Sequence, residues 1–319
     1  MAYSQDVYRR AVDVLDRRRE AANIKAQKNF EKISKEVPEL EEIQRKLSRV
    51  GLEISKLFLY EGNKEEQVKK LRQQSDKLRQ EKTAALKAKG YSDKDLEVPY
   101  TCPYCNDTGF IQNRICKNCH TKILRDIERA DLAKIAPVND CTFESFIVDE
   151  RFYPDKAYEK AEKILQSCRS YATNFTPSSK SLLLLGGVGV GKTHLSLAIA
   201  NVVINRGYSV IFGNSQNIIS DLQSEEFNEK KETQYNKRAV LNCDLLIIDD
   251  LGTEVLNQSR IAILYNIINS RLLSKLPTII SSNFTLDELE DKYDQRIFSR
   301  ITGEYSSLTL EGNNIRYIK

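Results

Sequence analysis

The chain has 319 residues, of which 40% are hydrophobic and 29% are charged, and its formal net charge is +4. That length and apolar content allow two or three domains and at least one sizeable core. The polar N-terminus and the lack of a long apolar run exclude a signal peptide and a membrane span, so we expect a cytoplasmic protein without a membrane partner. Residues 1–100 carry 23 Lys and Arg against 18 Asp and Glu, so any contact with DNA should be local rather than global.

Residues 1–99 have the composition of exposed helices, poor in glycine and proline and rich in charged residues. We predict a first helix from about residue 4 to about residue 35, ended by Pro38. Two further helices carry coiled-coil seams, one with Ile43, Leu47, Val50, Ile54 and Leu57 and the other with Val68, Leu71, Leu78 and Ala85. A turn at residues 61–63 would fold them into an antiparallel hairpin. We interpret this region as a protein-docking arm, with a solvated spacer as the alternative.

Four cysteines then form two C-x-x-C pairs, Cys102 with Cys105 and Cys116 with Cys119. Thiolates at this spacing converge on one tetrahedral Zn²⁺, so residues 100–136 are predicted to be a zinc-binding module. A closed site of four thiolates has no open position for water, which favours a structural metal. His120 as fourth ligand in place of Cys119 stays open, and a redox role is the weaker alternative. The other cysteines, Cys141, Cys168 and Cys243, are interpreted as buried apolar residues.

From residue 137 onward the pattern changes to alternating strands and helices. We predict an α/β domain over residues 137–319 with five strands, at residues 181–185, 209–212, 245–249, 278–282 and 307–310. Such alternation is typical of a parallel sheet covered on both faces, with its ligand at the carboxyl ends of the strands. The region before residue 137 would then form a separate, α-helical and zinc-binding part.

The apolar run 182–185 leads into a complete G-x-x-x-x-G-K-[ST] phosphate loop, which consists of Gly186, Gly187, Val188, Gly189, Val190, Gly191, Lys192 and Thr193. Its glycines let backbone N–H groups approach the phosphates, Lys192 reaches the β and γ phosphates, and the Thr193 hydroxyl can bind Mg²⁺. His194, at the start of the following amphipathic helix, joins the predicted nucleotide-binding residues. The preceding strand and this helix argue against a chance glycine-rich turn, so we predict an ATP site.

Two further strands end in polar residues that suit this site. The strand at 245–249 ends in Asp249 and Asp250, where a Walker B motif is expected, so Asp249 is predicted to hold Mg²⁺ and Asp250 to orient the attacking water. Asn283 follows the strand at 278–282 and could bond the γ-phosphate or that water, as a sensor 1 residue does. Because Asp250 is shorter than a glutamate, a nucleotide-switched adaptor with negligible hydrolysis remains an alternative.

Two arginines, Arg296 and Arg300, lie four residues apart and therefore on one helical face. A guanidinium is planar, permanently charged and multidentate, which suits developing phosphoryl charge. If Arg300 reaches the nucleotide of a neighbouring subunit, it is an arginine finger in trans. The alternative for both residues is an ordinary surface arginine in a salt bridge.

Together these motifs resemble the helicase-loader branch of AAA+ ATPases, the DnaC and DnaI type. The resemblance rests on the phosphate loop, residues 246–252 and 281–283, the Arg-x-x-Ser-Arg-Ile box from Arg296, and the closing residues 312–316. Loaders of the Firmicutes type also carry a charged helical N-terminal region followed by Cys-x-x-Cys-x-Asp-Thr-Gly and a second cysteine pair. The likeness therefore extends over nearly the whole chain.

The resemblance implies an ATPase, slow and regulated by DNA and its partner, with ATP, Mg²⁺ and Zn²⁺ as cofactors. Such a protein grips the hexameric replicative DNA helicase through its N-terminal domain and deposits it on single-stranded DNA when replication starts. Its ATPase domains would self-associate, with Arg300 of one copy completing the site of the next. Only nineteen residues follow Arg300, so no helical lid is expected. Whether Arg316 contacts nucleotide stays open.

Two questions remain open at this level. A transposition helper ATPase of the IstB kind has a similar core, although such helpers are not expected to carry the zinc module and helical arm. The stretch 224–239 mixes cations and aromatics of the type that follow single strands, namely Phe227, Lys230, Lys231, Tyr235, Lys237 and Arg238. An ordinary charged helix explains the same residues.

Overall fold

The computed structural model describes residues 3–58, 65–226 and 236–315. The chain divides into two compact units, Asp13–Cys116 and a larger unit made of Met1–Val12 with Lys117–Lys319. We call them the helical unit and the sheet unit. The predicted boundaries after residues 99 and 136 stay predictions. Within the described ranges, no helix combines the length and the apolar character that a membrane span requires.

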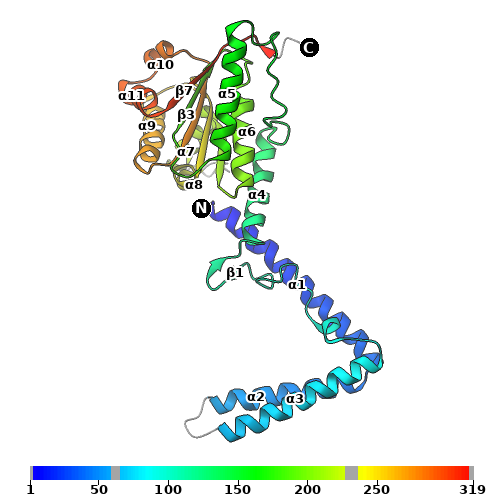
Figure 1. Cartoon of the computed structure of the whole chain (residues 1–319). Helices are drawn as coiled ribbons and strands as arrows, with labels where there is room; N and C mark the ends of the chain where they lie inside the picture. Colours follow the sequence, from blue (N-terminus) through cyan, green and yellow to red (C-terminus); the bar gives the residue numbers. More distant parts are fainter. Residues whose placement is uncertain (1–2, 59–64, 227–235, 316–319) are drawn as a thin grey trace. The chain divides into compact units, whose positions relative to one another are not determined.

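The helical unit consists mainly of long helices. Its elements are the greater part of α1 (Gln5–Glu36), then α2 (Glu39–Phe58), α3 (Glu65–Ala88), a 3₁₀ turn (Asp93–Leu96), β1 (Phe110–Ile111) and β2 (Arg114–Ile115). As predicted, α2 and α3 lie side by side as a hairpin (Figure 1). Ile43, Val50 and Leu78 are buried along its seam, with Leu47 packed beside them. The predicted turn at 61–63 lies outside the described residues.

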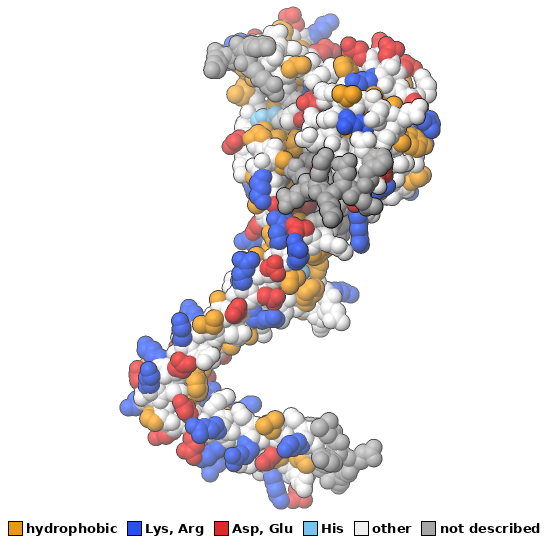
Figure 2. Space-filling model, turned by 180° about the vertical axis from the view of Figure 1, so that it is seen from behind, with side chains coloured by type: hydrophobic (Ala, Val, Ile, Leu, Met, Phe, Trp, Pro, Cys, Tyr) orange, Lys and Arg blue, Asp and Glu red, His pale blue; other side chains and the backbone are white. Residues whose placement is uncertain are grey.

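The buried clusters of this unit are small. Where α1 meets the hairpin, Ile33, Val37, Leu40 and Leu86 form a separate cluster from that of the seam. Lys and Arg side chains alternate with Asp and Glu over the surface of these helices, with scattered hydrophobic side chains between them (Figure 2). Helices with so narrow an apolar stripe gain little stability from burial.

The sheet unit is built on five parallel strands in the order β4-β5-β6-β3-β7. They are β3 (Leu182–Gly186), β4 (Val210–Asn214), β5 (Leu245–Leu251), β6 (Thr278–Ser282) and β7 (Ser306–Leu310). The predicted α/β class and all five predicted strands are confirmed. Because β6 lies between β5 and β3, the carboxyl ends of the strands that carry the three nucleotide motifs are neighbours.

Helices cover both faces of this sheet (Figure 1). They are α4 (His120–Ile135), α5 (Lys156–Thr173), α6 (Lys192–Asn205), α7 (Ser215–Glu226), α8 (Lys237–Asn242), α9 (Gln258–Leu273), α10 (Leu286–Lys292) and α11 (Gln295–Glu304). Successive side chains of β3 alternate between the faces, so Leu184 packs in the cluster under α5 and α6 and Leu183 in the cluster under α9. The residues described after β7, 311–315, contain no α-helix.

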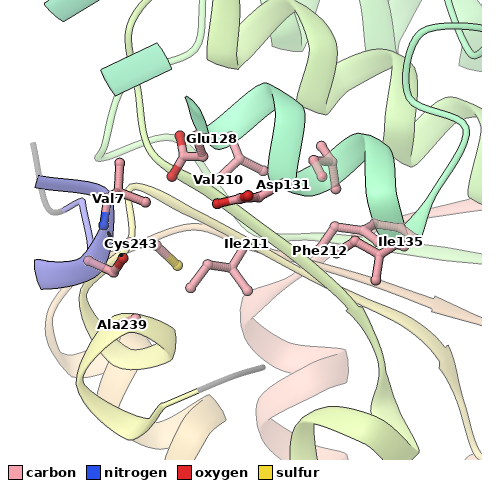
Figure 3. Close-up of a pocket in the computed structure, with 11 residues that line it drawn as sticks. Val7, Glu128, Asp131, Ile135, Val210, Ile211, Phe212, Ala239 and Cys243 are labelled. Carbon is pink, nitrogen blue, oxygen red and sulfur yellow. Dashed lines mark hydrogen bonds between the residues drawn. The ribbon is translucent and has the colours of Figure 1, made fainter. Parts of the chain in front are cut away.

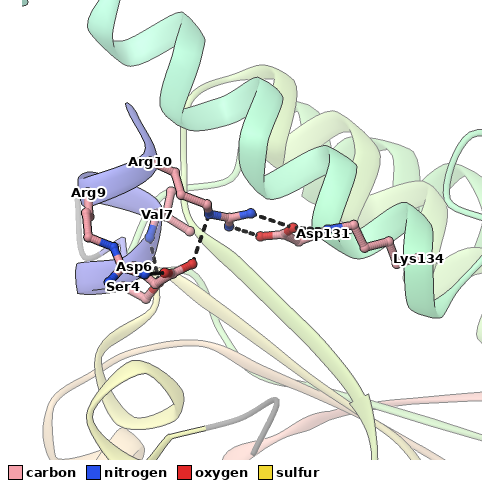
Figure 4. Close-up of polar contacts among 7 residues, drawn as sticks. All are labelled: Ser4, Asp6, Val7, Arg9, Arg10, Asp131 and Lys134. Atoms are coloured by element: carbon pink, nitrogen blue, oxygen red, sulfur yellow. Dashed lines mark hydrogen bonds and ion pairs between the residues drawn. The ribbon is translucent and has the colours of Figure 1, made fainter. Parts of the chain in front are cut away.

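The first turns of α1 pack onto the sheet unit, to which residues 5–12 belong. Arg10 forms an ion pair with Asp131 of α4, which also accepts a hydrogen bond from Lys134 at 3.0 Å (Figure 4). Burial acts to raise the pKa of Asp131, but the hydrogen bonds from Arg10 and Lys134 outweigh it and lower that pKa. A cavity of about 120 Å³ lies beside this contact, between α1, α4, α8 and the edge strand β4 (Figure 3).

One wall of this cavity is the side chain of Glu128, which is 8% exposed. Its carboxyl group accepts a hydrogen bond from the Val210 backbone, and its Oε2 has no partner within the described residues. Burial raises the pKa of Glu128 well above its ordinary value. The sheet unit thus holds a buried acid whose ionisation is unfavourable.

Candidate nucleotide site and zinc site

The phosphate loop runs from the end of β3 to the start of α6, the context that the sequence predicts. Gly191 is the N-cap of α6 and has a φ of 97°, in the left-handed region that favours glycine. A Cβ at this position would lie 2.5 Å from Cε2 of Phe146. The loop path therefore depends on the glycine that the motif specifies. The N-terminus of α6, a helix of 14 residues, lies at the loop, where its backbone N–H groups favour an anion.

Lys192 joins the phosphate loop to the end of β6. Its buried ammonium donates hydrogen bonds of 2.7 Å to the carbonyl oxygens of Gly186 and Gly187 and to Oδ1 of Asn283. Asn283 in turn donates from Nδ2 to Oδ1 of Asp250 at 3.3 Å. Three predicted residues from three different elements are thus connected through one amide, which lies between the loop and the Walker B acids.

Thr193 and Asp249 form the second contact across the site. The Thr193 hydroxyl donates to the Asp249 carboxylate, with oxygen distances of 2.9 and 3.1 Å. Ser281 of β6 donates to the same carboxylate at 2.5 Å. Burial raises the pKa of Asp249, against the opposing hydrogen bond from Ser281. A buried cluster of hydroxyl and carboxylate oxygens is the donor set that Mg²⁺ prefers, so these residues fit the predicted metal.

Asp250 reaches its position through an irregularity in β5. The pairing of β5 with β6 shifts register between Ile248 and Leu251, as in a β-bulge. Asp250 lies in this bulge with a φ of 54°, and its backbone N–H donates to Oγ of Ser281 at 3.0 Å. In a regular strand, Asp249 and Asp250 would point to opposite faces. The bulge instead lets both carboxylates take part in the same polar cluster.

Other residues around the loop were not predicted as site residues. Tyr153 donates from its hydroxyl to the Val190 carbonyl oxygen at 2.7 Å, and the Ile315 backbone N–H donates to the Gly189 carbonyl oxygen at 3.1 Å. A Cβ at Gly189 would collide with the side chain of Asn314. The closing residues thus pack on the phosphate loop, which explains why they accompany the motif. In the sequence Ser281 is only part of a strand end, and nothing there indicates that it bonds both aspartates.

His194 points away from this cluster. Its Nε2 lies 2.8 Å from the Thr142 carbonyl oxygen and 3.3 Å from Oγ of Ser145, and its ring packs edge-on against Phe146. Because a carbonyl only accepts, Nε2 carries the proton in this contact. The structure therefore brings the predicted loop residues together with Asp249, Asp250 and Asn283 but directs the imidazole towards residues 142–146. Its predicted contact with nucleotide stays a prediction.

Arg296 and Arg300 both contact Tyr265 of α9. Arg300 donates from Nε to Oδ1 of Asn269 at 2.9 Å and from NH2 to the Tyr265 hydroxyl at 3.0 Å. Arg296 forms an ion pair with Asp294 at 2.8 Å. Both guanidinium groups lie over the Tyr265 ring, at 5.3 and 4.8 Å from its centroid. Within the described residues, these contacts of the two arginines do not involve the phosphate loop of the same chain, and the predicted role in trans stays a prediction.

The four cysteines of the two C-x-x-C pairs are close together. Their Sγ atoms all lie within 4.8 Å of one another and all four residues are buried. Cys102 Sγ and Cys116 Sγ are 3.9 Å apart. A tetrahedral Zn²⁺ with Zn–S bonds of about 2.3 Å places its thiolates about 3.8 Å apart, so the four residues fit zinc. Within the described residues the cluster does not include His120, the alternative ligand.

Asp107 organises the first knuckle of this cluster and was not predicted. It is fully buried, and its carboxylate accepts hydrogen bonds from the backbone N–H groups of Thr101 at 2.7 Å and Cys102 at 2.9 Å. The Asp-Thr-Gly after the first cysteine pair was the only signal. The remaining cysteines, Cys141, Cys168 and Cys243, are buried and free, as predicted. Burial raises the pKa of the Cys168 thiol to about 12.

Comparison with known proteins decides the family. The model described as "IstB-like ATP binding protein" matches residues 129–316, more than half of the chain. The chain belongs to this family of IstB-like ATP-binding proteins. The match covers the phosphate loop, both Walker B aspartates, Asn283 and the arginine pair.

Two proteins with sequences similar to this IstB-like chain are named replicative helicase loaders. The replicative helicase loader DnaC of Escherichia coli K12 is 26% identical over 185 residues, 58% of this chain and 71% of the relative. The replicative helicase loader DnaI of Bacillus subtilis is 30% identical over 157 residues, 45% of this chain and 50% of the relative. These names confirm the resemblance to the DnaC and DnaI branch.

Solved structures with similar chains have related names. A crystal structure of the DnaC helicase loader is 25% identical, covers 55% of this chain and 98% of its own, and has a TM-score of 0.47. A crystal structure of DnaI is 26% identical, covers 56% of this chain and 92% of its own, and has a TM-score of 0.42.

Some predicted residues of this IstB-like protein fall outside the described ranges. They are Phe227, Lys230, Lys231 and Tyr235 of the proposed DNA stretch, and Arg316. The described end of that stretch is the start of α8, where Lys237 forms an ion pair with Glu226 at 2.9 Å. Arg238 is exposed. The DNA contact stays a prediction.

Proposed function

We propose that this chain is an ATP-dependent loader that binds the hexameric replicative DNA helicase and deposits it on single-stranded DNA during the initiation of DNA replication. One observation carries the proposal. The hydrogen-bonded group of Lys192, Asn283 and Asp250, with Thr193 and Asp249 beside it, belongs to an ATP-binding family member whose relatives are named replicative helicase loaders.

The residues of the site suit hydrolysis of a nucleoside triphosphate. Bound Mg·ATP supplies the phosphoanhydride bond and the charge-neutralising metal. Thr193 and Asp249 hold the metal, and Lys192 neutralises phosphate charge at the loop. Asp250 orients the attacking water, with its carboxylate fixed by the amide of Asn283 at 3.3 Å. The three donors of Lys192 are all bonded to protein oxygens in this structure, so bound phosphates would have to replace some of these partners.

We propose that neighbouring copies share each site. Arg300 is half-buried on α11 and held by Tyr265 and Asn269, which pre-orders a long side chain on the surface of the sheet unit. A pre-ordered guanidinium on one copy can serve the nucleotide of the next, as arginine fingers do. Arg296, exposed and paired with Asp294, is the second candidate on the same helix.

The helical unit is proposed to hold the helicase. Its hairpin α2–α3 exposes charged side chains and, among the side chains of α2 that the structure describes, the large apolar residue Leu52, which is 64% exposed. A helix face that buries little against its own chain suits a protein partner. Zn²⁺ in the four-cysteine cluster would brace the segment that follows the hairpin, without a role in hydrolysis.

Two alternatives have observations in their favour. The matching family is named for IstB, which favours a transposition helper. The aspartate at position 250, in place of a longer side chain, favours a nucleotide switch with negligible hydrolysis. Both alternatives predict ATP binding, so they differ from the loader in partner and turnover.

The deciding experiment uses the full chain and the purified replicative helicase of the same organism. We expect a stable complex by size-exclusion chromatography, helicase transfer to single-stranded DNA that needs ATP, and ATP turnover that changes when single-stranded DNA is added. Leu52→Glu should weaken the complex, whereas Ile24→Glu, at a 49% exposed position of α1, is the matched control. A folded, zinc-loaded chain that fails to bind helicase would favour the transposition helper, and binding without turnover would favour the switch.

A further inference from the structure

A second acid follows the Walker B motif and has no place in the proposed chemistry. Glu254 lies four residues after Asp250 and is 2% exposed. Its Oε2 accepts hydrogen bonds from Oγ of Ser215 at 2.7 Å and from the backbone N–H of Gly252 at 3.0 Å, and its Oε1 accepts one from the Tyr293 hydroxyl. Three donors satisfy a buried carboxylate, which cannot donate.

These three partners come from three different connections at the carboxyl edge of the sheet. Ser215 is the first residue of α7, directly after β4. Gly252 belongs to the turn after β5, and Tyr293 is the C-cap of α10, which follows β6. Burial, and next the charge of Glu254, raise the pKa of Tyr293, so its hydroxyl remains a donor at neutral pH. One carboxylate therefore fastens the ends of β4, β5 and β6 to one another.

The turn that Glu254 closes contains the main chain of Asp250. The Asp250 carbonyl oxygen accepts from Oγ1 of Thr253 at 2.9 Å and lies 3.1 Å from Oγ of Ser215. Gly252 has a φ of 109° and lies against the Phe284 ring, where a side chain would collide. Asp250 itself has a φ of 54°, an uncommon backbone conformation for a non-glycine residue, which persists only when its surroundings enforce it.

We propose that Glu254 is a positioning residue for ATP hydrolysis, which holds the bulged turn of β5 so that the Asp250 carboxylate meets Asn283. This inference rests on the proposed ATPase function and deepens it. Glu254 does not touch nucleotide, metal or water in this role, and it acts through the backbone of residues 250–252. A catalytic carboxylate that is displaced by about 1 Å loses up to about 100-fold in rate, while binding of the nucleotide at the phosphate loop is spared.

The test compares Glu254→Ala, Glu254→Gln and Tyr293→Phe in the full chain. Glu254→Ala is expected to lower kcat by about 10- to 100-fold with the KM for ATP and the Kd for a fluorescent ATP analogue within about 2-fold of wild type. Glu254→Gln keeps an acceptor for Gly252 and a polar group for Tyr293, so it should restore kcat to within about 3-fold of wild type. Tyr293→Phe removes one donor only and should lie between them.

A second readout does not depend on turnover. Amide hydrogen exchange without nucleotide should rise in peptides covering residues 249–255 of Glu254→Ala and Tyr293→Phe and stay unchanged in peptides covering 186–193. Matched controls are Glu290→Gln, an exposed acid on α10, and Tyr158→Phe, whose hydroxyl donates to the surface residue Glu162. Neither control should change kcat or exchange at 249–255.

The outcomes separate this inference from the proposed function. If the wild type hydrolyses ATP and Glu254→Ala and Tyr293→Phe turn over equally fast, the inference alone is overturned. It is also overturned if the folded Tyr293→Phe variant loses kcat and ATP affinity to the same extent. A wild-type chain that binds but does not hydrolyse ATP overturns the ATPase function. In that case the exchange measurement still decides whether Glu254 holds the turn, since unchanged exchange at 249–255 would show that it does not.

Discussion

The two units of this chain are stabilised in different ways. The sheet unit has two large buried clusters, one on each face of its five strands, and its polar groups are concentrated at one edge. The described part of the helical unit has two small clusters and a charged surface. A large core can enforce uncommon backbone conformations such as that of Asp250, whereas a narrow seam cannot. The difference supports the proposals that place ATP hydrolysis on the sheet and partner docking on the helices.

The largest expected effect tests whether the chemistry of the sheet unit is complete within one copy. Lys192→Ala and Arg300→Ala should each lower ATP turnover by about 1,000-fold, the first through the phosphates and the second through the neighbouring copy. An equimolar mixture should regain about a quarter of wild-type turnover, because about one interface in four then joins an intact phosphate loop to an intact arginine. Turnover is measured by phosphate release.

A mixture without recovery would contradict sharing of the site between copies. The matched control is Arg169→Ala, which removes a surface ion pair with Glu144 at 3.3 Å. It should change turnover by less than about 2-fold, because exposed ion pairs contribute little.

The next effect tests whether the four-cysteine site stabilises the chain without affecting the nucleotide site. Cys102→Ser should reduce bound zinc, measured by mass spectrometry, and lower the melting temperature of the chain, because a structural Zn²⁺ contributes folding free energy directly. The Kd for an ATP analogue should stay within about 2-fold of wild type, since the phosphate loop has its own core. Cys168→Ser, at a fully buried free thiol, is the control that should leave zinc content unchanged. Full zinc occupancy in Cys102→Ser would contradict the assignment.

Sequence patterns predicted most of both units, for reasons of periodicity. The apolar runs before Lys192 and Asp249 indicated buried strands, and the seam of Ile43 and Val50 indicated the hairpin that the structure has. The bulge at Asp250 could not be predicted, because its backbone N–H bonds Ser281 on another strand, and Glu254 of the same turn bonds Ser215 and Tyr293 of other elements. Contacts that join separate elements leave no periodic signal in the chain.

The sequence motifs also did not show which of their residues support the sites through packing and backbone contacts. Asp107 and Asn314 lie in motifs that the sequence displays, yet Asp107 bonds the Cys102 backbone N–H and the side chain of Asn314 packs beside Gly189. Such roles depend on three-dimensional packing of turns with positive φ. The place of His194 beside Thr193 suggested a contact with nucleotide; its ring packs against Phe146 in this structure, and the nucleotide contact stays a prediction.

The packing of the two cores can be compared through the loss of unfolding free energy caused by one substitution in each unit. Leu184 and Leu86 are both fully buried, the first in a sheet cluster and the second in a helical one. We expect Leu184→Ala to lower the free energy of unfolding by about 4 kcal/mol and Leu86→Ala by about 2 kcal/mol, because the smaller cluster collapses around the cavity more easily. Urea unfolding followed by amide hydrogen exchange in peptides of each unit measures both. Equal losses would contradict the difference in packing between the units.

The smallest effect concerns Glu128, an acid that the sheet unit buries with one carboxyl oxygen lacking a partner among the described residues. Because burial raises the folded pKa of Glu128 above its ordinary value of 4.5, the folded state binds more protons than the unfolded state above that pH. Stability is therefore fully present below about pH 4.5 and falls as the pH rises towards the folded pKa, at up to about 1.4 kcal/mol per pH unit. Glu128→Gln keeps the shape and removes the titration, so it should stabilise the chain by about 1 kcal/mol at pH 8 and leave it nearly unchanged at pH 5. Thermal unfolding at both pH values checks this, with Asp126→Asn, an acid with an exposed side chain on the same helix, as the control. If Glu128→Gln is stabilised equally at both pH values, the stabilisation comes from the amide itself and not from removal of the titrating carboxyl group.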